Sequence, residues 1–373
     1  MNPPNVWLPK PALQRLIDRL RGWGYGVFGP RVADGAVTIG EVATVADLPA
    51  GVRDEQQPGR YRLTTVEDGG YFDHVNGPHS LKPFLFPPRT TVLEVRRVGT
   101  SWEARAPEPP RPKQAVLGVR ACDLHALAVQ DRVFLGGPHP DPEYVARRDG
   151  LFLVAVNCGR SAATCFCSSM DTGPEVGDGA DLVFTELADG FVVRIGTEAG
   201  ARAVDGLGSR ETTAAELAAA KEVPKRAAGQ QTRRINPATV RDTLMNNLTH
   251  PRWDDVAARC LACTNCTMVC PTCFCSTVNE VTDLAGSTTT RERVWESCFN
   301  EEHSWTPGGP VHATTKTRYR QWLTHKLATW IDQFGTSGCV GCGRCITWCP
   351  VGIDITEEVA AIRGGGEREH APA

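Results

Sequence analysis

CLACTNCTMVCP, at Cys260–Pro271, carries the clearest structural signal in this chain. Its cysteines have the spacing C-x2-C-x2-C-x3-C, and a proline follows the last of them. The same spacing returns in CVGCGRCITWCP, at Cys339–Pro350. Two full matches in one chain are not a chance occurrence. We therefore expect the two runs to pack together and the rest of the chain to be arranged around them.

This spacing is the one that holds cubane iron–sulfur clusters in bacterial two-cluster ferredoxins. Three thiolates two residues apart can converge on one cluster, and the fourth points the other way. The alternative is a pair of structural zinc sites built from the C-x2-C pairs. Zinc needs no special fourth position, whereas both runs supply one and end in Cys-Pro. The sequence therefore predicts two [4Fe-4S] clusters.

In two-cluster ferredoxins the fourth cysteine of each run ligates the cluster of the other run. The predicted ligands of cluster 1 are Cys260, Cys263, Cys266 and Cys349, and those of cluster 2 are Cys339, Cys342, Cys345 and Cys270. The alternative is that each run closes its own cluster. Either way both sets are complete with four thiolates, so no iron is left open to a substrate. We predict no catalytic residue.

The pentapeptide TCFCS occurs twice, at 164–168 and, directly after the first run, at 272–276. Its paired cysteines predict a third iron–sulfur cluster with ligands from Cys165, Cys167, Cys273 and Cys275, and with Cys158 and Cys298 as alternates. The competing interpretation is buried free thiols, because cysteine packs well as a small hydrophobic residue. Cys122, in RACDLH, is interpreted as a helix entry, and the group Glu301, Glu302 and His303 as a solvated turn.

The bulk composition excludes several classes of protein. The chain has 373 residues and a net charge of −3, which implies no nucleic-acid or anionic-membrane surface. Its longest apolar runs, such as Leu151–Val156, are far too short to span a bilayer. No secretory signal is recognisable, so the 15 cysteines favour metal ligation over disulfides and a cytoplasmic location. There is no GxGxxG after a strand and no P-loop.

The pattern of elements predicts an α+β multidomain protein: mixed α/β N-terminal and central regions, and a C-terminal α-helical two-cluster ferredoxin domain. An amphipathic helix is expected at 11–21, and a strand–helix–strand unit with parallel strands between residues 115 and 156. Residues 316–334 have apolar and aromatic residues at helical spacing. The expected regions are 1–110, 111–230 with the first TCFCS, 235–363 with both runs, and a disordered tail at 364–373.

Several segments together resemble a known family. They are VNGPHSLKPFLFPP, GVRACDLHAL, DPEYVARRDGLFLVAVNC, TCFCSSMDTGP, DLVFTEL and WESCFNEEHSWTPGG, in addition to the two runs. This order is similar to the β subunit of sulfhydrogenases, the group 3b NADP-linked [NiFe] hydrogenases, and to the A subunit of anaerobic sulfite reductase. The TCFCS repeats and the RACDL block are its more specific part.

The resemblance implies a non-catalytic iron–sulfur electron-transfer subunit in a hetero-oligomer. Its partners would be a flavin/NADP(H)-binding subunit and the small and large subunits of a [NiFe] hydrogenase. The alternatives are a relay subunit of a sulfite reductase complex, or a catalytic subunit that uses the C-x-C pairs as redox thiols or as a cluster. A regulatory iron–sulfur sensor is disfavoured, because no helix-turn-helix or basic patch is present.

Overall fold

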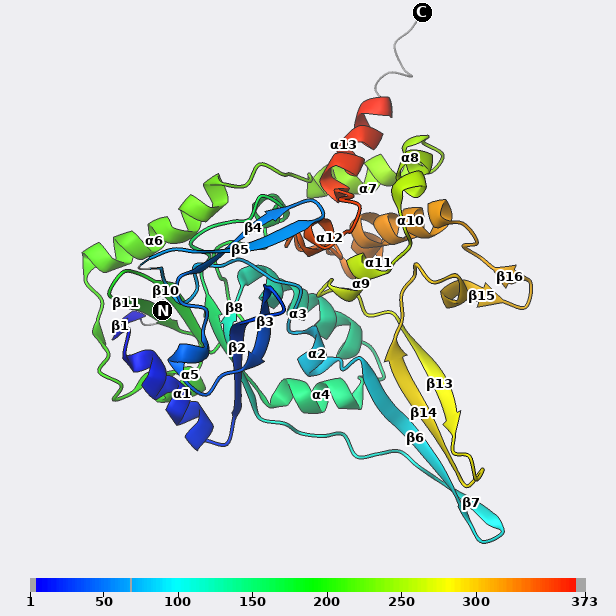
Figure 1. Ribbon diagram of the computed structural model, residues 1–373, viewed down its shortest axis with the longest axis horizontal. Coiled ribbons are helices and arrows are strands. Elements are labelled where there is room, and N and C mark those ends of the chain that lie inside the picture. The colour runs from blue at the N-terminus through cyan, green and yellow to red at the C-terminus, as the bar shows by residue number, and fades with distance from the viewer. Residues whose placement is uncertain (1–4, 68, 367–373) are drawn as a thin grey trace, which may run out of the picture.

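An eight-stranded mixed sheet forms the framework of the first part of the chain (Figure 1). The computed structural model describes residues 5–67 and 69–366. The strand order is β12-β1-β11-β10-β9-β8-β2-β3. Neighbours among β2, β8, β9 and β10 run parallel, and the other pairs are antiparallel. The strands are β1 (Asn5–Pro9), β2 (Gly26–Ala33), β3 (Ala36–Glu41), β8 (Gln114–Val119), β9 (Leu151–Val156), β10 (Leu182–Glu186), β11 (Gly190–Ile195) and β12 (Arg210–Glu211).

The central strands are buried on both faces, as their continuous apolar sequence predicts. In β9, Phe152 and Val154 face the core that helices α1 (Ala12–Gly22) and α5 (Glu198–Val204) cover. The alternate residues Leu153 and Ala155 face the core under α2 (Lys82–Leu85), α3 (Ala121–Phe134) and α4 (Pro142–Asp149). Helix α6 (Ala214–Gly229) packs on β10 and β11.

Several sequence predictions are confirmed in this part. The amphipathic helix is α1, whose Leu13, Leu16, Ile17 and Leu20 are all fully buried. The strand–helix–strand unit is β8, α3 and β9, and its strands are parallel. The sheet takes strands from both the predicted N-terminal region and the predicted central region. These two regions therefore form one folded unit in the structure.

A two-stranded hairpin, β4 (Val52–Gln57) and β5 (Arg60–Thr65), connects this unit to the second cysteine run. The Gly59 N–H donates to the Ile346 carbonyl oxygen at 3.1 Å. The Tyr61 ring stacks on Trp348 with a centroid distance of 5.1 Å. The N-terminal part of the chain thus supports one side of the C-terminal domain.

A four-stranded sheet projects from the body of the molecule, at the lower right of Figure 1. We call it the arm; its strand order is β13-β14-β6-β7. It joins β6 (Arg89–Val98) and β7 (Ser101–Arg105) to a hairpin between the two cysteine runs, β13 (Ser276–Thr282) and β14 (Thr288–Trp295). This hairpin was not predicted, although STVNEVT and TTTRERVW are rich in β-branched residues.

The C-terminal domain is otherwise helical, as predicted, and its core contains Trp253, Tyr319, Trp322 and Leu323. Its helical segments are α7 (Pro237–Met245), α8 (Arg252–Arg259), α9 (Asn265–Met268), α10 (Thr315–Thr324), the π-helical turn η4 (His325–Thr329), α11 (Trp330–Phe334), α12 (Arg344–Thr347) and α13 (Ile355–Gly366). The predicted helix at 316–334 is therefore α10, η4 and α11 in succession.

The short elements that remain are η1 (Val45–Asp47), η2 (Cys167–Met170), η3 (Glu301–Ser304), β15 (Trp305–Thr306) and β16 (Gly309–Pro310). Residues 364–366, expected in the disordered tail, continue α13, and 367–373 lie outside the described residues. Among the helices of residues 5–67 and 69–366, none is long and apolar enough to cross a membrane.

Candidate iron–sulfur sites

The two cysteine runs adopt the same backbone conformation. In each run the second and fourth residues after the first cysteine have positive φ: 50° at Ala262 and 69° at Thr264, and 61° at Gly341 and 75° at Gly343. For residues other than glycine such a conformation costs about 1–3 kcal/mol and persists where the surroundings impose it, often at binding sites. The first run therefore adopts the loop conformation of the second run at an energetic cost, since it has no glycine at these two positions.

The shared loop turns backbone amides toward sulfur. The Ala262 N–H donates to Cys260 Sγ at 3.4 Å, and the Gly341 N–H donates to Cys339 Sγ at 3.5 Å. A hydrogen bond to the charged form of a thiol favours the thiolate, which is the form that ligates metal. Each loop then enters a short helix, α9 in the first run and α12 in the second.

The first group of thiols lines one cavity. Cys260, Cys263, Cys266 and Cys349 all lie on its wall, together with Cys345 of the second run. The remainder of the wall is largely apolar and includes Phe299, Tyr319, Trp322, Ile353 and Ile355. Burial raises the pKa of Cys266, and the neighbouring thiolates of Cys260, Cys349 and Cys263 raise it further. The structure thus brings Cys349 to the first run.

The second group contains the other three thiols of the second run and Cys270. Burial raises the pKa of Cys345, and the thiolates of Cys339, Cys342 and Cys270 raise it further. Burial likewise raises the pKa of Cys342, which also has Cys270 as a neighbour. Both groups thus have the composition of the predicted ligand sets. Whether they hold clusters in this way stays a prediction.

Lys326 places a buried positive charge beside the second group. Its Nζ lies 3.2 Å from Cys270 Sγ and also donates to Thr272 Oγ1 and the Gly338 carbonyl oxygen. Burial lowers the pKa of Lys326, but the thiolates of Cys270 and Cys273 outweigh burial and hold the pKa well above its ordinary value. Lys326 lies in the π-helical turn η4, a type of helix defect that is frequent at functional sites.

A third group of thiols lies where the parallel strands end. Cys122 is in the first turn of α3, just after β8, and Cys158 follows the end of β9. Because β8 and β9 are parallel neighbours, their carboxyl ends meet at one edge of the sheet. The first TCFCS segment supplies Cys165 and Cys167 to the same edge.

Contacts link these four thiols to one another and to the second run. Cys122 and Cys167 pack together with Cys342. Burial raises the pKa of Cys165, and the thiolates of Cys167, Cys158 and Cys342 add to this. Between the loops, the Phe166 N–H donates to the Gly341 carbonyl oxygen at 2.9 Å. The third group therefore lies directly beside the second.

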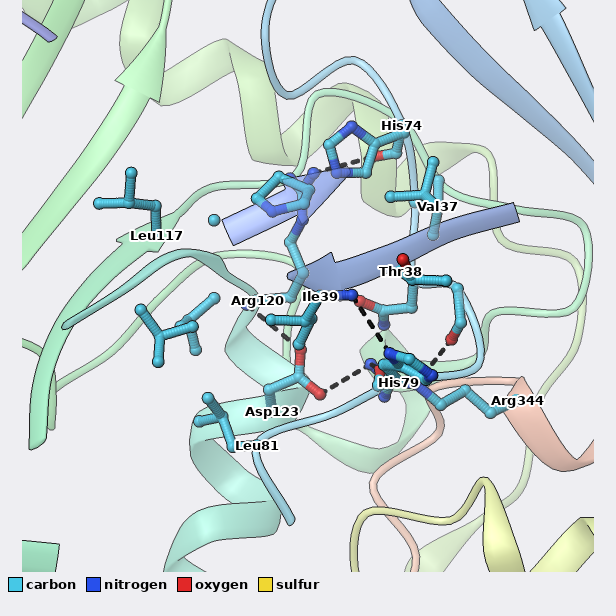
Figure 2. A pocket seen from close by; sticks show the side chains of 17 residues that line it. Val37, Thr38, Ile39, His74, His79, Leu81, Leu117, Arg120, Asp123 and Arg344 are labelled. Carbon is cyan, nitrogen blue, oxygen red and sulfur yellow. Dashed lines mark hydrogen bonds and ion pairs between the residues drawn. The ribbon is translucent and has the colours of Figure 1, made fainter. Parts of the chain in front are cut away.

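A buried network of charges supports this junction (Figure 2). Arg344 is 2% exposed and pairs with Asp123 at 2.9 Å, and its guanidinium also donates to the carbonyl oxygens of Gly77 and His79. Burial lowers the pKa of Arg344, but Asp123 and the thiolates of Cys342 and Cys122 outweigh burial and raise it. A positive charge thus lies between the second and third groups.

Arg120 supports the third group from the sheet side. Its guanidinium donates to the carbonyl oxygens of Phe72 and His74, at 3.0 and 2.8 Å. Its charge favours the thiolate form of Cys158, although burial raises the pKa of that thiol overall. Each of the second and third groups therefore has a buried cation beside it.

The second TCFCS segment lies elsewhere. Cys273 lies near Cys270, because Lys326 Nζ is 3.2 Å from Cys270 Sγ and 3.6 Å from Cys273 Sγ. The neighbouring Cys298 thiol lowers the pKa of Cys275. The thiols that act on Cys165 are those of Cys167, Cys158 and Cys342, and none belongs to the second TCFCS. The structure thus joins each C-x-C pair to other cysteines and does not join the pairs to each other. The predicted ligand set of the third cluster takes thiols from both places, and it stays a prediction.

The donor sets of the three thiol groups fit iron–sulfur clusters. Each has four thiols, the first is lined by apolar side chains, and the second and third have buried cations that offset thiolate charge. Within residues 5–67 and 69–366, no three or more His, Cys, Asp or Glu side chains are placed to hold a single metal ion.

Sequence reasoning missed three residues that the structure places at these sites. Cys122 was interpreted as a helix entry, yet the predicted strand–helix–strand unit already placed it at the same sheet edge as Cys158. Lys326 and Arg344 gave no such signal, because their burial depends on contacts between distant segments. His303, interpreted as part of a solvated turn, is exposed there, and the neighbouring Cys275 thiol raises its pKa.

Comparison with known proteins gives two matches. Residues 259–353 match the 4Fe-4S dicluster domain family. The chain is 33% identical over 261 residues to sulfhydrogenase 2 subunit beta of Pyrococcus furiosus, and the match covers 68% of this chain and 75% of that protein. No solved structure matches the chain significantly.

Proposed function

Because the chain belongs to the family of sulfhydrogenase beta subunits, we propose that it relays electrons between a flavin/NADP(H)-binding subunit and the small subunit of a [NiFe] hydrogenase. The dicluster domain and the family together make it an iron–sulfur electron-transfer subunit. The identity of its partners is the part that we add. A hetero-oligomer with the flavin subunit and both hydrogenase subunits follows from this proposal.

One observation carries the relay: three groups of four thiols lie in continuous contact. Cys345 of the second group also lines the cavity of the first, and Cys342 packs against Cys122 and Cys167 of the third. Iron–sulfur clusters bound by such thiolates take up and release single electrons. A row of adjacent sites supports transfer through the subunit rather than chemistry on a substrate.

We propose three [4Fe-4S] clusters along this row. The first two have the ligands predicted from the runs. The third has the ligands Cys122, Cys158, Cys165 and Cys167, which replaces the mixed set inferred from the TCFCS repeats. This assignment rests on the position of the four thiols at one sheet edge and on their contacts.

The chain's other residues set the conditions for electron transfer. Phe299, Tyr319 and Trp322 limit the access of water to the first group. Lys326 and Arg344 place positive charge beside thiolates of the second, which stabilises an added electron. Cys263 is exposed, so the first group extends to the surface, where a partner can approach.

The test is the composition and electron flux of the native complex. We expect nickel and flavin to co-purify with the chain, and NADPH to support hydrogen evolution. Cys165→Ser should remove one cluster and abolish this flux while dye-linked hydrogen oxidation by the hydrogenase subunits persists. Ser168→Ala, at an exposed position of the same segment, is the matched control.

Other outcomes would refute parts of the proposal. Sirohaem in place of nickel would assign the chain to a sulfite reductase complex. Turnover of a disulfide substrate by the isolated chain would favour redox-thiol catalysis. Unchanged electron flux in Cys165→Ser would remove the third group from the relay.

A further inference from the structure

Two buried side-chain amides point at sulfur atoms of the third group. Asn76 Nδ2 lies 3.1 Å from Cys122 Sγ, and Gln231 Nε2 lies 3.2 Å from Cys167 Sγ. Asn76 is only 9% exposed and Gln231 only 7%. Because an amide NH2 group donates and does not accept, each sulfur is the acceptor of the hydrogen bond. The two donors come from outside the segments that supply the thiols.

The orientation of the Gln231 amide is fixed by its other contacts. The Ser168 N–H donates to Gln231 Oε1 at 3.0 Å, so the oxygen end of the amide is occupied. The nitrogen end then faces Cys167, and it also donates to Ser161 Oγ at 3.0 Å. The reverse orientation of the amide would lose all three hydrogen bonds and set an oxygen against the sulfur.

Asn76 is held over Cys122 by the loop 74–77, which is fixed along its whole length. A Cβ at Gly77 would lie 1.7 Å from the Val37 carbonyl oxygen, so the loop packs directly against β3. Hydrogen bonds also fix the backbone of each residue of the loop. Their other partners are four buried side chains, those of Asp54, Gln56, Arg120 and Arg344.

The two sulfurs behave as acceptors. In the hydrogen bonds of residues 5–67 and 69–366, the sulfur atoms of Cys122 and Cys167 occur only as acceptors. A neutral thiol is a weak acceptor, whereas an ionised group forms shorter and stronger hydrogen bonds. The two buried amides therefore suit the thiolate form of both cysteines, which is the form that ligates metal.

Side-chain amides distinguish the third group from the other two. In the first group, the backbone N–H groups of Ala262 and Ile353 donate to sulfur. In the second group, the donors include the Gly341 N–H and the Lys326 ammonium. Within the described part of the chain, no Asn or Gln side chain donates to a sulfur of these two groups.

We propose that Asn76 and Gln231 are positioning residues that raise the reduction potential of the third cluster, by donating N–H···S hydrogen bonds to Cys122 and Cys167. The inference rests on the third cluster of the proposed function and not on the identity of the partners. The step is the transfer of one electron from the second cluster to the third, in which no bond breaks and no proton moves. The added electron makes the sulfurs more negative, so the hydrogen bonds stabilise the reduced cluster more than the oxidised one.

The competing interpretation is that the amides only satisfy their own hydrogen-bonding capacity, as buried polar groups in general do. Their removal would then lower the stability of the protein and leave the potential of the cluster unchanged. The reduction potential therefore separates the two interpretations, whereas stability does not.

The experiment is a redox titration of the full chain, purified without oxygen and followed by paramagnetic resonance. Gln231→Met keeps the length of the side chain but removes the donor, and it should shift one midpoint potential downward and leave the others unchanged. Asn76→Leu should shift the same potential, and the double variant should shift it further. Gln230→Met is the matched control, because Gln230 is exposed and accepts from the Ser161 N–H at 2.8 Å instead of donating to a sulfur.

A second measurement needs no variant. Nitrogen-15 is introduced selectively into the side-chain amides of asparagine and glutamine of the wild-type chain. Pulsed paramagnetic resonance of the reduced protein should then detect such a nitrogen coupled to a cluster. This measurement keeps the inference open to refutation if the variants lose the third cluster or fail to fold.

Four results would overturn the inference. Unshifted potentials in both Gln231→Met and Asn76→Leu, with three clusters retained, would remove the role of the amides and leave the third cluster in place. An equal shift in Gln230→Met would do the same, as would the absence of any coupled amide nitrogen in the labelled wild type. Iron and sulfide for only two clusters in the wild type would remove the third cluster and the inference together.

Discussion

Replacing Lys326 with methionine should lower the reduction potential of the cluster that we propose Cys270 ligates. Methionine fills a similar volume but removes the charge whose nitrogen lies 3.2 Å from Cys270 Sγ. An electron added to the cluster is attracted by this ammonium. Without the ammonium the reduced state loses that stabilisation, while the oxidised state is affected less.

The magnitude follows from Coulomb's law. Two unit charges about 3.2 Å apart at an effective dielectric constant of about 20 interact by roughly 5 kcal/mol. The added electron is spread over the cluster, at about twice that distance, which leaves about 2.5 kcal/mol. For a one-electron couple this equals a shift of roughly 110 mV.

The assay is a redox titration of the whole complex followed by paramagnetic resonance. Lys326→Arg, which keeps the charge, should stay much closer to the wild type than Lys326→Met. Lys316→Met is the control: it removes a cation from the preceding α10 that pairs with Asp254 at the surface. The reasoning is wrong if Lys326→Met retains its clusters and shifts no potential downward, or if the Lys316 variant shifts equally.

Four further substitutions test other parts of the structure. Thr264→Gly should raise the free energy of unfolding by about 1 kcal/mol, because Thr264 has a φ of 69°. Gly343→Ala should lower the free energy of unfolding by roughly 3 kcal/mol, since the added Cβ would lie 2.5 Å from a carbonyl oxygen. Thermal unfolding of the cluster-loaded protein measures both, and a Gly343→Ala variant as stable as Thr264→Gly would contradict this. Arg344→Met leaves Asp123 buried without its partner, so the free energy of unfolding measured with denaturant should fall by about 3–5 kcal/mol. A decrease below about 1 kcal/mol would instead be that of a solvent-exposed ion pair. Burial, together with nearby arginines, lowers the pKa of His74 well below its ordinary value, so the unfolded chain binds a proton that the folded chain does not. The contribution of His74 to the free energy of unfolding should therefore be constant above about pH 6.5 and fall by about 1.4 kcal/mol per pH unit below it. His74→Gln should lack this pH dependence. Identical dependence of stability on pH in the wild type and in His74→Gln would refute the prediction.

The sequence predicted elements whose signal is local. The spacing of leucines in α1 and the aromatic residues of α10 and α11 depend only on helical periodicity. The unit β8–α3–β9 was recognisable from two short apolar strands and the helix between them. The spacing of the two cysteine runs encodes a loop that the structure forms twice, while the ligand sets predicted from the runs stay predictions.

The features that could not be predicted concern contacts between distant segments. Nothing in the local sequence around Cys165 and Cys273 says which sheet edge each will reach, so an identical pentapeptide suggested a shared site. The β13–β14 hairpin pairs locally, but its place beside β6 in the arm depends on a segment far back in the chain and could not be predicted. The burial of Lys326 could not be predicted, because Lys326 lies in a π-helical turn. The α-helical periodicity of the sequence gives no sign of such a turn.

If the clusters have the crossed ligand sets that we propose, the exchange of the fourth cysteine between the runs has a consequence for biogenesis. Cys260, Cys263 and Cys266 meet their fourth partner only when the ribosome has added roughly eighty more residues, which takes on the order of ten seconds at ordinary rates of synthesis. During that interval the nascent chain carries three unpaired thiols beside an unfinished loop. Cluster delivery to this loop must therefore follow translation of Cys349, and both loops become ready for a carrier protein at nearly the same moment.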